Sequence, residues 1–372
     1  MVSLSQAASR LLRDESRLPM VKKWATSTNR WGAQTAPVAT QDTVFLCEDS
    51  SGVRAVRSDT GETVWTRQQL TCWSQPALAG ERLFVRDYGS LKSLDTQSGE
   101  IAWEVPISDR GSGRPEVARG RVFYTEPGLV AARESQDGAL VWQRELHEPA
   151  LVGATPAGDL VVYSDKKIHC LEGQTGDTQW TIPAPGKVAA RLTPDGTLLL
   201  QRPTGGWLPV LMPEKNTLFG YDSASGSRLW KEHTPALTFE VDEHGQFLTA
   251  DHQGHVEQRI ARTGERTWSA ECKSTPEWLQ ATPDGTWLVG ERTALTALAA
   301  DTGEQLWQGR LERPTGQPAS GPNGTLFVRS EGEIFCLTRP VDGREEAATN
   351  PVTLREEDDL VFFDGLAVER RS

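Results

Sequence analysis

Three histidines, His244, His252 and His255, form the cluster of side chains in this chain whose types and spacing best suit metal chemistry. His252 and His255 flank a predicted hairpin turn, and His244 lies one predicted strand earlier. Imidazole nitrogens bind zinc, but a structural zinc site takes four ligands, and no cysteine pair or His-Glu-x-x-His motif lies near them. We therefore interpret these histidines as parts of solvated turns and predict no metal site.

Motifs for nucleophilic catalysis and phosphate binding are missing from the sequence. Neither Gly-x-Ser-x-Gly nor a phosphate-cradling glycine loop occurs, and the acidic run at 356–359 is typical of a solvated link. We therefore predict no catalytic residue. An enzyme that gathers residues from several repeats at a central channel stays an alternative, because one sequence cannot show such convergence.

The cysteines indicate a reducing environment. Five of them are scattered through the chain without a Cys-x-x-Cys pair, namely Cys47, Cys72, Cys170, Cys272 and Cys336. Scattered cysteines in an odd number are typical of reduced thiols that serve as small core residues. The sequence therefore predicts a cytoplasmic protein without disulfides.

Charge and hydropathy exclude several classes of partner. The chain has 51 acidic and 39 basic residues, a net charge of −12, and no basic stripe, so nucleic acid is not an expected partner. The sequence contains no run of 18 apolar residues, so we predict no membrane span. The first twenty residues lack the apolar core of a secretory signal, and we expect a soluble protein.

A repeat of about 38 residues organises the whole chain. Seven segments share the pattern Gly-x-x-x-Trp, and successive tryptophans are 38, 39, 38, 50, 38 and 39 residues apart. A degenerate eighth copy at 343–347 lacks the ring. The seven pairs are Gly61 and Trp65, Gly99 and Trp103, Gly138 and Trp142, Gly176 and Trp180, Gly226 and Trp230, Gly264 and Trp268, and Gly303 and Trp307.

Each repeat predicts one four-stranded antiparallel sheet. Short β-rich runs such as Thr43–Cys47 and Arg82–Val85 alternate with turn formers such as Pro194-Asp-Gly196. The repeat glycine suits a turn with positive φ between the third and fourth strands. The tryptophan then lies on the outermost strand, where its ring can cover the seam to the next sheet. We predict structural roles for both residues in every repeat.

The pattern resembles the PQQ-like β-propeller repeat family, most clearly in Leu94–Trp103 and Tyr221–Trp230. The resemblance implies an all-β propeller over about residues 20–345. Quinone dehydrogenases of this family carry an adjacent cysteine pair and a calcium site, and neither is visible here, so we predict no PQQ and no other cofactor. The family also contains a lipoprotein that assists outer-membrane protein assembly. This chain shows no lipobox, so only that protein's mode of action, binding through one face, is expected here.

The chain ends suggest how the ring closes. Residues 1–19 predict a helical extension, with apolar residues on one face, and residues 20–372 predict a single propeller domain. The segment at 20–24 is similar to an isolated fourth strand, and the hairpin at 360–370 stops where a fourth strand would begin. We expect these two to pair and close a ring of eight or nine blades.

The fifth repeat carries the best candidate for function. Its tryptophan spacing of 50 leaves about 12 extra residues, which contain Trp207, Leu208, Leu211 and Met212. Exposed Trp and Met side chains commonly anchor protein interfaces. We therefore predict a monomeric, non-enzymatic scaffold that binds an unknown protein partner through this extension. The alternative is a hydrolase or lyase, or a small-molecule or metal binder, that uses the central channel.

Overall fold

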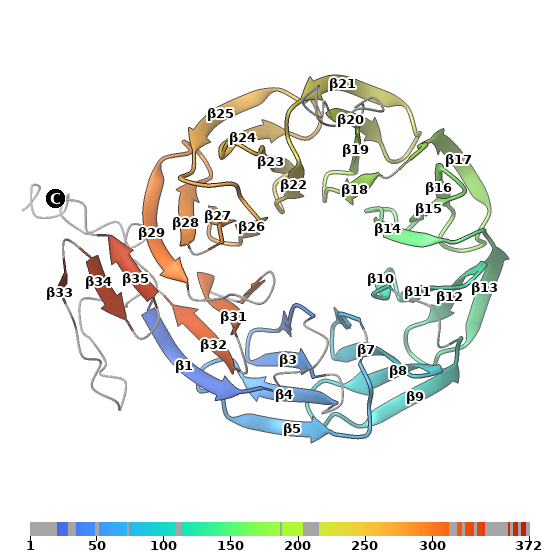
Figure 1. The fold of residues 1–372 in the computed structure, drawn as a ribbon. Helices are drawn as coiled ribbons and strands as arrows, with labels where there is room; N and C mark the ends of the chain where they lie inside the picture. The colour runs from blue at the N-terminus through green and yellow to red at the C-terminus, as the bar shows by residue number, and fades with distance from the viewer. Residues whose placement is uncertain are drawn as a thin grey trace, which may run out of the picture.

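The computed structural model describes residues 21–28, 35–48, 52–72, 74–108, 113–186, 188–203, 216–292, 294–311, 318–321, 324–330 and 333–338, and strands within 356–369. Every regular element among these residues is a β-strand, apart from isolated turns. Eight antiparallel blades surround a central opening (Figure 1). The predicted all-β propeller is confirmed, with eight blades.

The first four blades follow the chain order, and each is a four-stranded sheet. Blade 1 consists of β2 (Val38–Ala39), β3 (Thr43–Cys47), β4 (Val53–Arg57) and β5 (Thr63–Arg67). Blade 2 consists of β6 (Ala77–Ala79), β7 (Arg82–Asp87), β8 (Ser90–Asp95) and β9 (Ile101–Pro106). Blade 3 consists of β10 (Glu116–Ala118), β11 (Arg121–Glu126), β12 (Leu129–Glu134) and β13 (Leu140–Glu145). Blade 4 consists of β14 (Ala150–Ala154), β15 (Leu160–Ser164), β16 (Lys167–Leu171) and β17 (Thr178–Pro183).

The last four blades repeat this order until the chain ends must meet. Blade 5 consists of β18 (Ala189–Leu192), β19 (Thr197–Pro203), β20 (Asn216–Asp222) and β21 (Arg228–Thr234). Blade 6 consists of β22 (Thr238–Val241), β23 (Gln246–Ala250), β24 (His255–Ile260) and β25 (Arg266–Glu271). Blade 7 begins with β26 (Trp278–Thr282), β27 (Thr286–Gly290), β28 (Ala294–Ala299) and β29 (Gln305–Leu311). Blade 8 combines β30 (Ala319–Ser320), β31 (Leu326–Ser330) and β32 (Glu333–Thr338) with β1 (Val21–Ser27).

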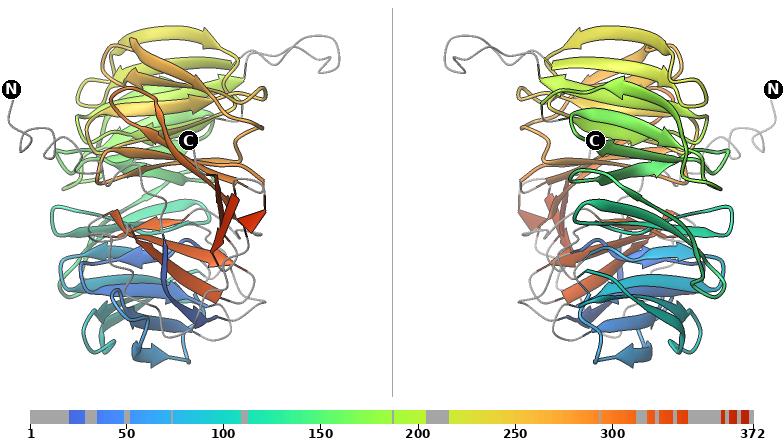
Figure 2. Two further views of the ribbon diagram at one scale, coloured as in Figure 1. Left: turned by 90° about the vertical axis from the view of Figure 1, so that its left-hand side faces the viewer. Right: turned by 90° about the vertical axis from the view of Figure 1, so that its right-hand side faces the viewer.

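The first strand of each blade lines the central opening and the fourth lies outermost (Figure 1). Because the strands alternate in direction, the turns between strands one and two and between strands three and four share one side of the ring. We call this side the turn face. The other side carries the turns between strands two and three and the connections between blades, and we call it the connector face. The two sides are seen edge-on in Figure 2.

The core lies at the seams between neighbouring blades. Second and third strands are the most apolar, and Leu83, Phe84 and Val85 of β7 are fully buried. The buried residues form eight clusters, each shared by two adjacent blades, such as Phe45 and Trp65 of blade 1 with Leu83 of blade 2. Each blade is therefore stabilised mainly by the two beside it.

The N-terminal strand closes the ring, but not with the expected partner. β1 pairs antiparallel with β32, with Trp24 opposite Cys336, and becomes the fourth strand of blade 8. The expected pairing of the N-terminal strand with the C-terminal hairpin is wrong, because β30 to β32 already supply the three strands that β1 completes. Trp24 thus takes the place of the ring that the degenerate eighth copy lacks.

The C-terminal hairpin extends blade 7 instead of forming a ninth blade. β33 (Glu356–Glu357), β34 (Leu360–Phe363) and β35 (Leu366–Glu369) pair in succession, and β35 pairs with the outer edge of β29 (Figure 1). Blade 7 is therefore a seven-stranded sheet.

The predicted extension at 1–19 lies outside the described residues. No described helix has the length and apolar character that a membrane crossing needs.

Candidate interaction surface

The repeat residues are arranged as a continuous set of seam contacts. All seven repeat glycines have φ between 68° and 76°, and a Cβ at each would lie within 3 Å of a tryptophan ring of the preceding blade. Seven indoles, from Trp24 to Trp268, donate Nε1–H to a backbone carbonyl of the following blade over 2.8 to 3.0 Å. At each of these seams the glycine is required for two reasons, namely the positive φ of the turn and the close approach of the tryptophan ring.

Trp307 departs from this set. Its ring is 5% exposed, and its Nε1 atom is buried without a hydrogen-bond partner. The corresponding part of blade 8 would follow β32, beyond the residues that the structure describes. The tryptophans of the set therefore pack at the seams between blades.

The candidate partner-binding residues Trp207, Leu208, Leu211 and Met212 lie outside the described residues, but the base of their segment is described. β19 and β20 pair up to Pro203 opposite Asn216, at the connector face of blade 5. The structure therefore fixes the two points between which the extension runs.

Two buried amides anchor this base to the next blade. The Gln201 and Asn216 side chains are 5% and 6% exposed, and each donates to the Ala236 carbonyl over 2.6 Å. Ala236 belongs to the connection from blade 5 to blade 6. Because two donors from neighbouring strands converge on one carbonyl, the spacing of β19, β20 and the connection is fixed.

A second layer of contacts supports β20 from its other side. The Arg202 guanidinium lies over the Phe219 ring, 4.6 Å from its centroid, and the Thr217 hydroxyl is 2.9 Å from Nδ1 of His233. Such cation–π contacts contribute about 0.5–1 kcal/mol at exposed sites. The base of the extension is thus a firm support on the connector face.

Acidic residues at the ends of the second strands form a repeated feature that the sequence analysis missed. Asp87 Oδ1 accepts the Thr71 N–H over 2.7 Å, and Glu126 Oε2 accepts the Ser108 N–H over 2.7 Å. Glu291 Oε1 likewise accepts a backbone N–H over 2.8 Å. Each carboxylate thus caps the connection that enters its own blade. The signal was available as an acid that recurs just after the second strand, in Glu48, Asp87, Glu126, Asp251 and Glu291.

The histidine cluster does not assemble into a metal site. His255 Nδ1 lies 3.1 Å from Asp251 Oδ2, and its Nε2 lies 3.4 Å from Glu271 Oε1. The hydrogen bond to Asp251 and the charge of that carboxylate raise the pKa of His255. Throughout the described part of the chain, no group of three or more His, Cys, Asp or Glu side chains could hold a metal ion.

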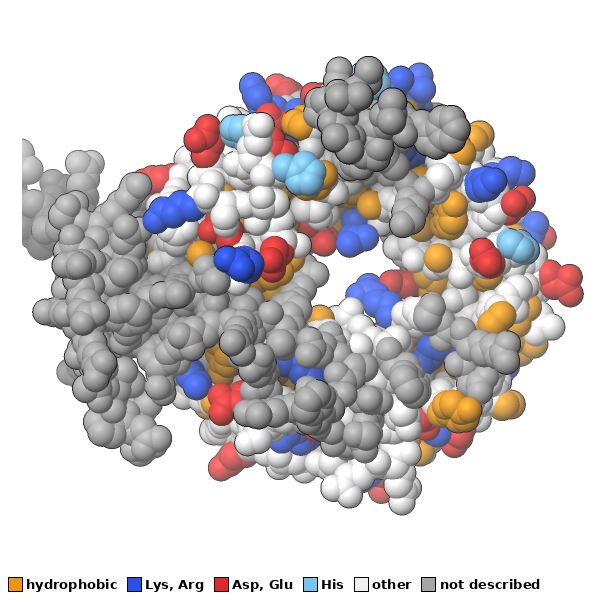
Figure 3. All heavy atoms as spheres, in the orientation of Figure 1, with side chains coloured by type: hydrophobic (Ala, Val, Ile, Leu, Met, Phe, Trp, Pro, Cys, Tyr) orange, Lys and Arg blue, Asp and Glu red, His pale blue; other side chains and the backbone are white. Residues whose placement is uncertain are grey.

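The central opening is lined by the first strands of the blades, which are short and contain mostly small residues. Both positive and negative side chains lie at the part of its rim that is not drawn in grey (Figure 3). One ion pair crosses a seam there, between Arg191 of β18 and Glu240 of β22 at 3.5 Å, and another joins Arg114 to Glu116 at 2.9 Å. In both of these ion pairs the arginine charge is neutralised by a glutamate.

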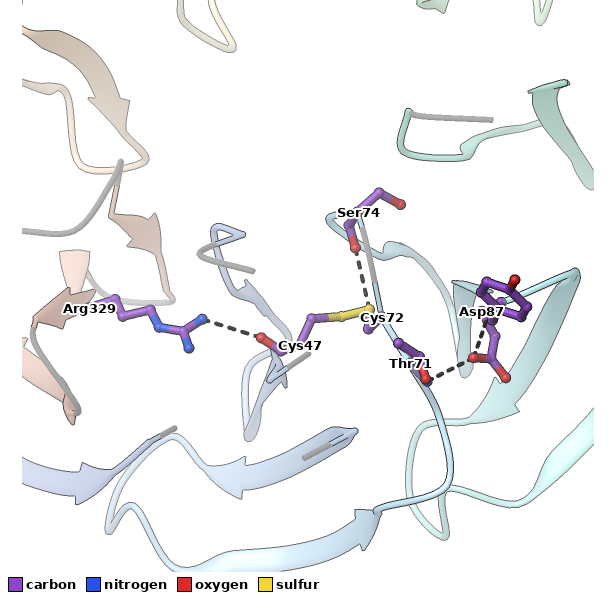
Figure 4. The surroundings of a disulfide bond; sticks show 7 residues. Cys47, Thr71, Cys72, Ser74, Asp87 and Arg329 are labelled. Carbon is purple, nitrogen blue, oxygen red and sulfur yellow. Dashed lines mark hydrogen bonds between the residues drawn. A yellow bond between two sulfur atoms is a disulfide. The ribbon is translucent and has the colours of Figure 1, made fainter. Parts of the chain in front are cut away.

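Two of the cysteines differ from the expectation. Cys47 at the end of β3 and Cys72 on the connection to blade 2 form a disulfide, with Cα atoms 5.5 Å apart (Figure 4). The expectation of reduced thiols is wrong for this pair, because folding brings together two side chains that lie 25 residues apart in sequence. Arg329 of blade 8 donates to the Cys47 carbonyl over 3.2 Å. The disulfide therefore lies at the seam between blades 1 and 2, while blade 8 contacts the Cys47 backbone.

The other three cysteines, Cys170, Cys272 and Cys336, are free, and burial raises the pKa of each thiol to about 12. A thiol with such a pKa is protonated and unreactive at neutral pH. The cytoplasmic location, which no contact tests, stays a prediction.

These features define the class of the protein as an eight-bladed β-propeller whose repeat residues serve the seams between blades. A family model described as outer membrane protein assembly factor BamB matches residues 49–163, 126–278 and 252–346. The chain belongs to this family, and the resemblance to the PQQ-like repeat is confirmed.

Solved structures show the same fold. BamB from Moraxella catarrhalis is 15% identical, with a TM-score of 0.62 over 86% of this chain and 100% of that chain. Quinohemoprotein alcohol dehydrogenase from Comamonas testosteroni is 13% identical, with a TM-score of 0.60 over 91% of this chain and 78% of that chain. Likeness at these identities concerns the fold alone.

One curated relative is similar in sequence over part of its length. The serine/threonine-protein kinase AfsK of Streptomyces coelicolor is 30% identical over 184 residues, which are 45% of this chain and 20% of the kinase. The chain thus spans about a fifth of that protein.

Proposed function

We propose that the protein is a non-enzymatic scaffold that binds a partner protein through the connector face, at the extension that contains Trp207, Leu208, Leu211 and Met212. The observation that carries the proposal is the anchoring of the base, where Gln201 and Asn216 converge on the Ala236 carbonyl. A rigid base lowers the entropy cost of presenting an apolar segment to a partner.

The sequence of the extension supports the same proposal. Its residues are mostly apolar and include Trp207 and Met212, which are types enriched at the centres of protein interfaces. The family model's own description is that of an outer membrane protein assembly factor, which agrees with a scaffold. We also propose that the protein is a monomer and binds no PQQ.

The experiment compares partner binding by the full chain and by Trp207→Ala combined with Leu211→Ala. A photo-crosslinking amino acid at position 208 identifies the partner from the native host by mass spectrometry, and binding of that purified partner is then measured. Tyr88→Ala is a matched control, because Tyr88 is 68% exposed in the turn between β7 and β8 on the same face.

We expect the double variant to weaken binding at least about 30-fold, as for loss of hot-spot residues worth about 2 kcal/mol, with Tyr88→Ala unchanged. Equal binding by the double variant would remove the proposal. Stoichiometric metal in the purified protein, together with activity that is independent of the extension, would favour the channel enzyme instead.

A further inference from the structure

A polar groove lies between blades 3 and 4 on the turn face, opposite the face of the proposed interaction surface. Its volume is about 410 Å³, within the range of about 300–1,000 Å³ for small-molecule sites. It is bordered by the β10–β11 turn, the β14–β15 turn and the β16–β17 turn. The lining residues are Arg119, Arg121, Ala157, Gly158, Asp159, Glu172, Gly173, Gln174 and Gln179.

Arg121 brings an unsatisfied guanidinium to this groove. Its side chain is 19% exposed, and its Nε atom is buried and has no hydrogen-bond partner among the described residues. The nearest carboxylate, Glu134 on the adjacent strand, lies 3.9 Å away, which is beyond hydrogen-bond distance. A buried charged donor without a partner is costly, so it points to a group that completes its hydrogen bonds.

Arg119 supplies a second guanidinium in a conformation that disfavours side chains. Its φ is +49°, in the left-handed region, where glycine would be less strained. The side chain crosses the seam, because a Cβ at Gly158 would lie 2.5 Å from Arg119 Cγ, and Nη2 donates to the Pro156 carbonyl over 2.8 Å. The hydrogen bond to Pro156 thus holds a cation at the rim of the groove.

Other seams place an anion at the corresponding contact. A Cβ at Gly245 would meet Asp195 between blades 5 and 6, and one at Gly324 would meet Asp284 between blades 7 and 8. These aspartates accept hydrogen bonds from threonines of their own turns. A charged side chain of the preceding blade thus meets a turn glycine at three of the described seams, and it is an arginine only between blades 3 and 4.

Two carboxylates face the arginines across the groove, and each is only half used. Asp159 Oδ1 accepts the Gly173 N–H over 3.0 Å, and Glu172 Oε2 accepts the Thr175 hydroxyl over 2.8 Å. Within the described residues, these bonds leave Asp159 Oδ2 and Glu172 Oε1 available as acceptors. The groove thus combines two cations with two anions.

We infer that this groove binds an α-amino carboxylate. The carboxylate of the ligand accepts hydrogen bonds from Arg121 and Arg119, whose planar guanidinium groups match its geometry. The amino group donates to the free oxygen of Asp159 or Glu172. The balanced charge disfavours phosphate, which would bring a second negative charge beside two carboxylates. A free amino acid and the C-terminal residue of a peptide share this chemistry.

The test is calorimetric titration of the full chain with glycine, L-leucine and L-glutamate, and with acetate, methylamine and inorganic phosphate as partial or competing ligands. The dipeptide Gly-Leu and its C-terminal amide distinguish a peptide end from a free amino acid. Arg121→Gln removes the unsatisfied guanidinium. Arg82→Gln is the matched control, because Arg82 has the same strand position in blade 2, opposite Asp95 as Arg121 is opposite Glu134.

We expect at least one amino acid or the dipeptide to bind more tightly than acetate, methylamine or phosphate. Arg121→Gln should raise its Kd about tenfold or more, in line with loss of a charged hydrogen bond, while Arg82→Gln should leave the Kd within about twofold. Arg119→Gly is the second variant, because glycine adopts the same φ without strain, and it should also weaken binding.

Several results would overturn the inference. Absence of binding by all amino acids and by the dipeptide would do so, as would unchanged binding in Arg121→Gln and Arg119→Gly. Tighter binding of phosphate, or equal binding of the dipeptide amide when free amino acids do not bind, would show that the carboxylate is not what the groove recognises.

Discussion

Replacing Gly138 by alanine tests whether the repeat glycine is required for the close approach of a ring as well as for its turn. The new Cβ would lie 2.9 Å from two atoms of the Trp103 ring and 3.3 Å from Val105 Cγ1, at φ +75°. Gly128 is the matched control in the same blade, because its φ is +81° and a Cβ there would meet nothing within 4 Å. Both variants carry the cost of a left-handed alanine, about 1 kcal/mol.

Gly138→Ala carries a second cost at the seam. Overpacking typically costs about 1–3 kcal/mol, and displacement of the Trp103 ring also disturbs its 3.0 Å hydrogen bond to the Ser135 carbonyl. We expect the free energy of unfolding to fall by about 2–4 kcal/mol for Gly138→Ala and by about 1 kcal/mol for Gly128→Ala. Urea denaturation followed by tryptophan fluorescence measures both. Equal losses in the two variants would refute the seam argument and leave only the turn.

Three further predictions concern contacts elsewhere in the ring. Replacing Cys47 and Cys72 together by alanine should lower the free energy of unfolding by about 3 kcal/mol, as expected for a loop of this length. Alkylation of the denatured, unreduced wild-type protein should modify three thiols. Modification of five thiols would contradict the disulfide. Trp103→Phe should lower the free energy of unfolding by about 1 kcal/mol more than Trp307→Phe, because only the first variant loses a hydrogen bond. Equal losses in denaturant melts would show that the bond from Trp103 to the Ser135 carbonyl does not contribute to stability. For His255, NMR titration should give a pKa above the ordinary value of about 6.5. Its contribution to stability should therefore be complete below that value and lost as the pH rises through the higher folded pKa, and a midpoint at or below 6.5 would count against the ion pair.

The repeat could be predicted from the sequence because its determinants are local. Gly99 and Trp103 lie four residues apart, so the turn and the outer strand can be recognised without knowing any distant contact. The same spacing recurs in seven blades, and repetition makes a short motif specific. The interlocking of Gly99 with Trp65 of the preceding blade needed the structure, because it joins two repeats.

Long-range pairing could not be predicted in the same way. The segment of β1 was recognisable as a fourth strand, but two distant segments, β32 and the C-terminal hairpin, were each compatible with it by pattern. Strand pairing depends on which edge is free in space, and the sequence does not record that. The joining of Cys47 and Cys72 has the same origin, since it depends on the path of the connection between blades 1 and 2.

The candidate sites also differ in whether local sequence is enough to predict them. An apolar extension is visible as a break in the period, so Trp207 and its neighbours could be chosen from sequence. The base that anchors it and the groove at Arg121 could not, because each gathers side chains from two blades. The acidic residues that cap the connections could be predicted in part, since Asp87 and Glu126 occupy equivalent positions at the ends of their second strands.

Closure by β1 has a consequence for the order in which the chain becomes protected during synthesis. Blade 8 and blade 1 meet through residues as far apart as Arg329 and Cys47, which are separated by 282 positions. At about 5–20 residues per second, a ribosome needs roughly 15–60 s to cover that interval. Throughout it, β1 waits for its partner β32. Lys22 and Lys23 lie on that strand, and lysines on an open edge discourage pairing with other chains. We therefore expect the two charges to disfavour pairing of β1 with other chains before β32 has been made.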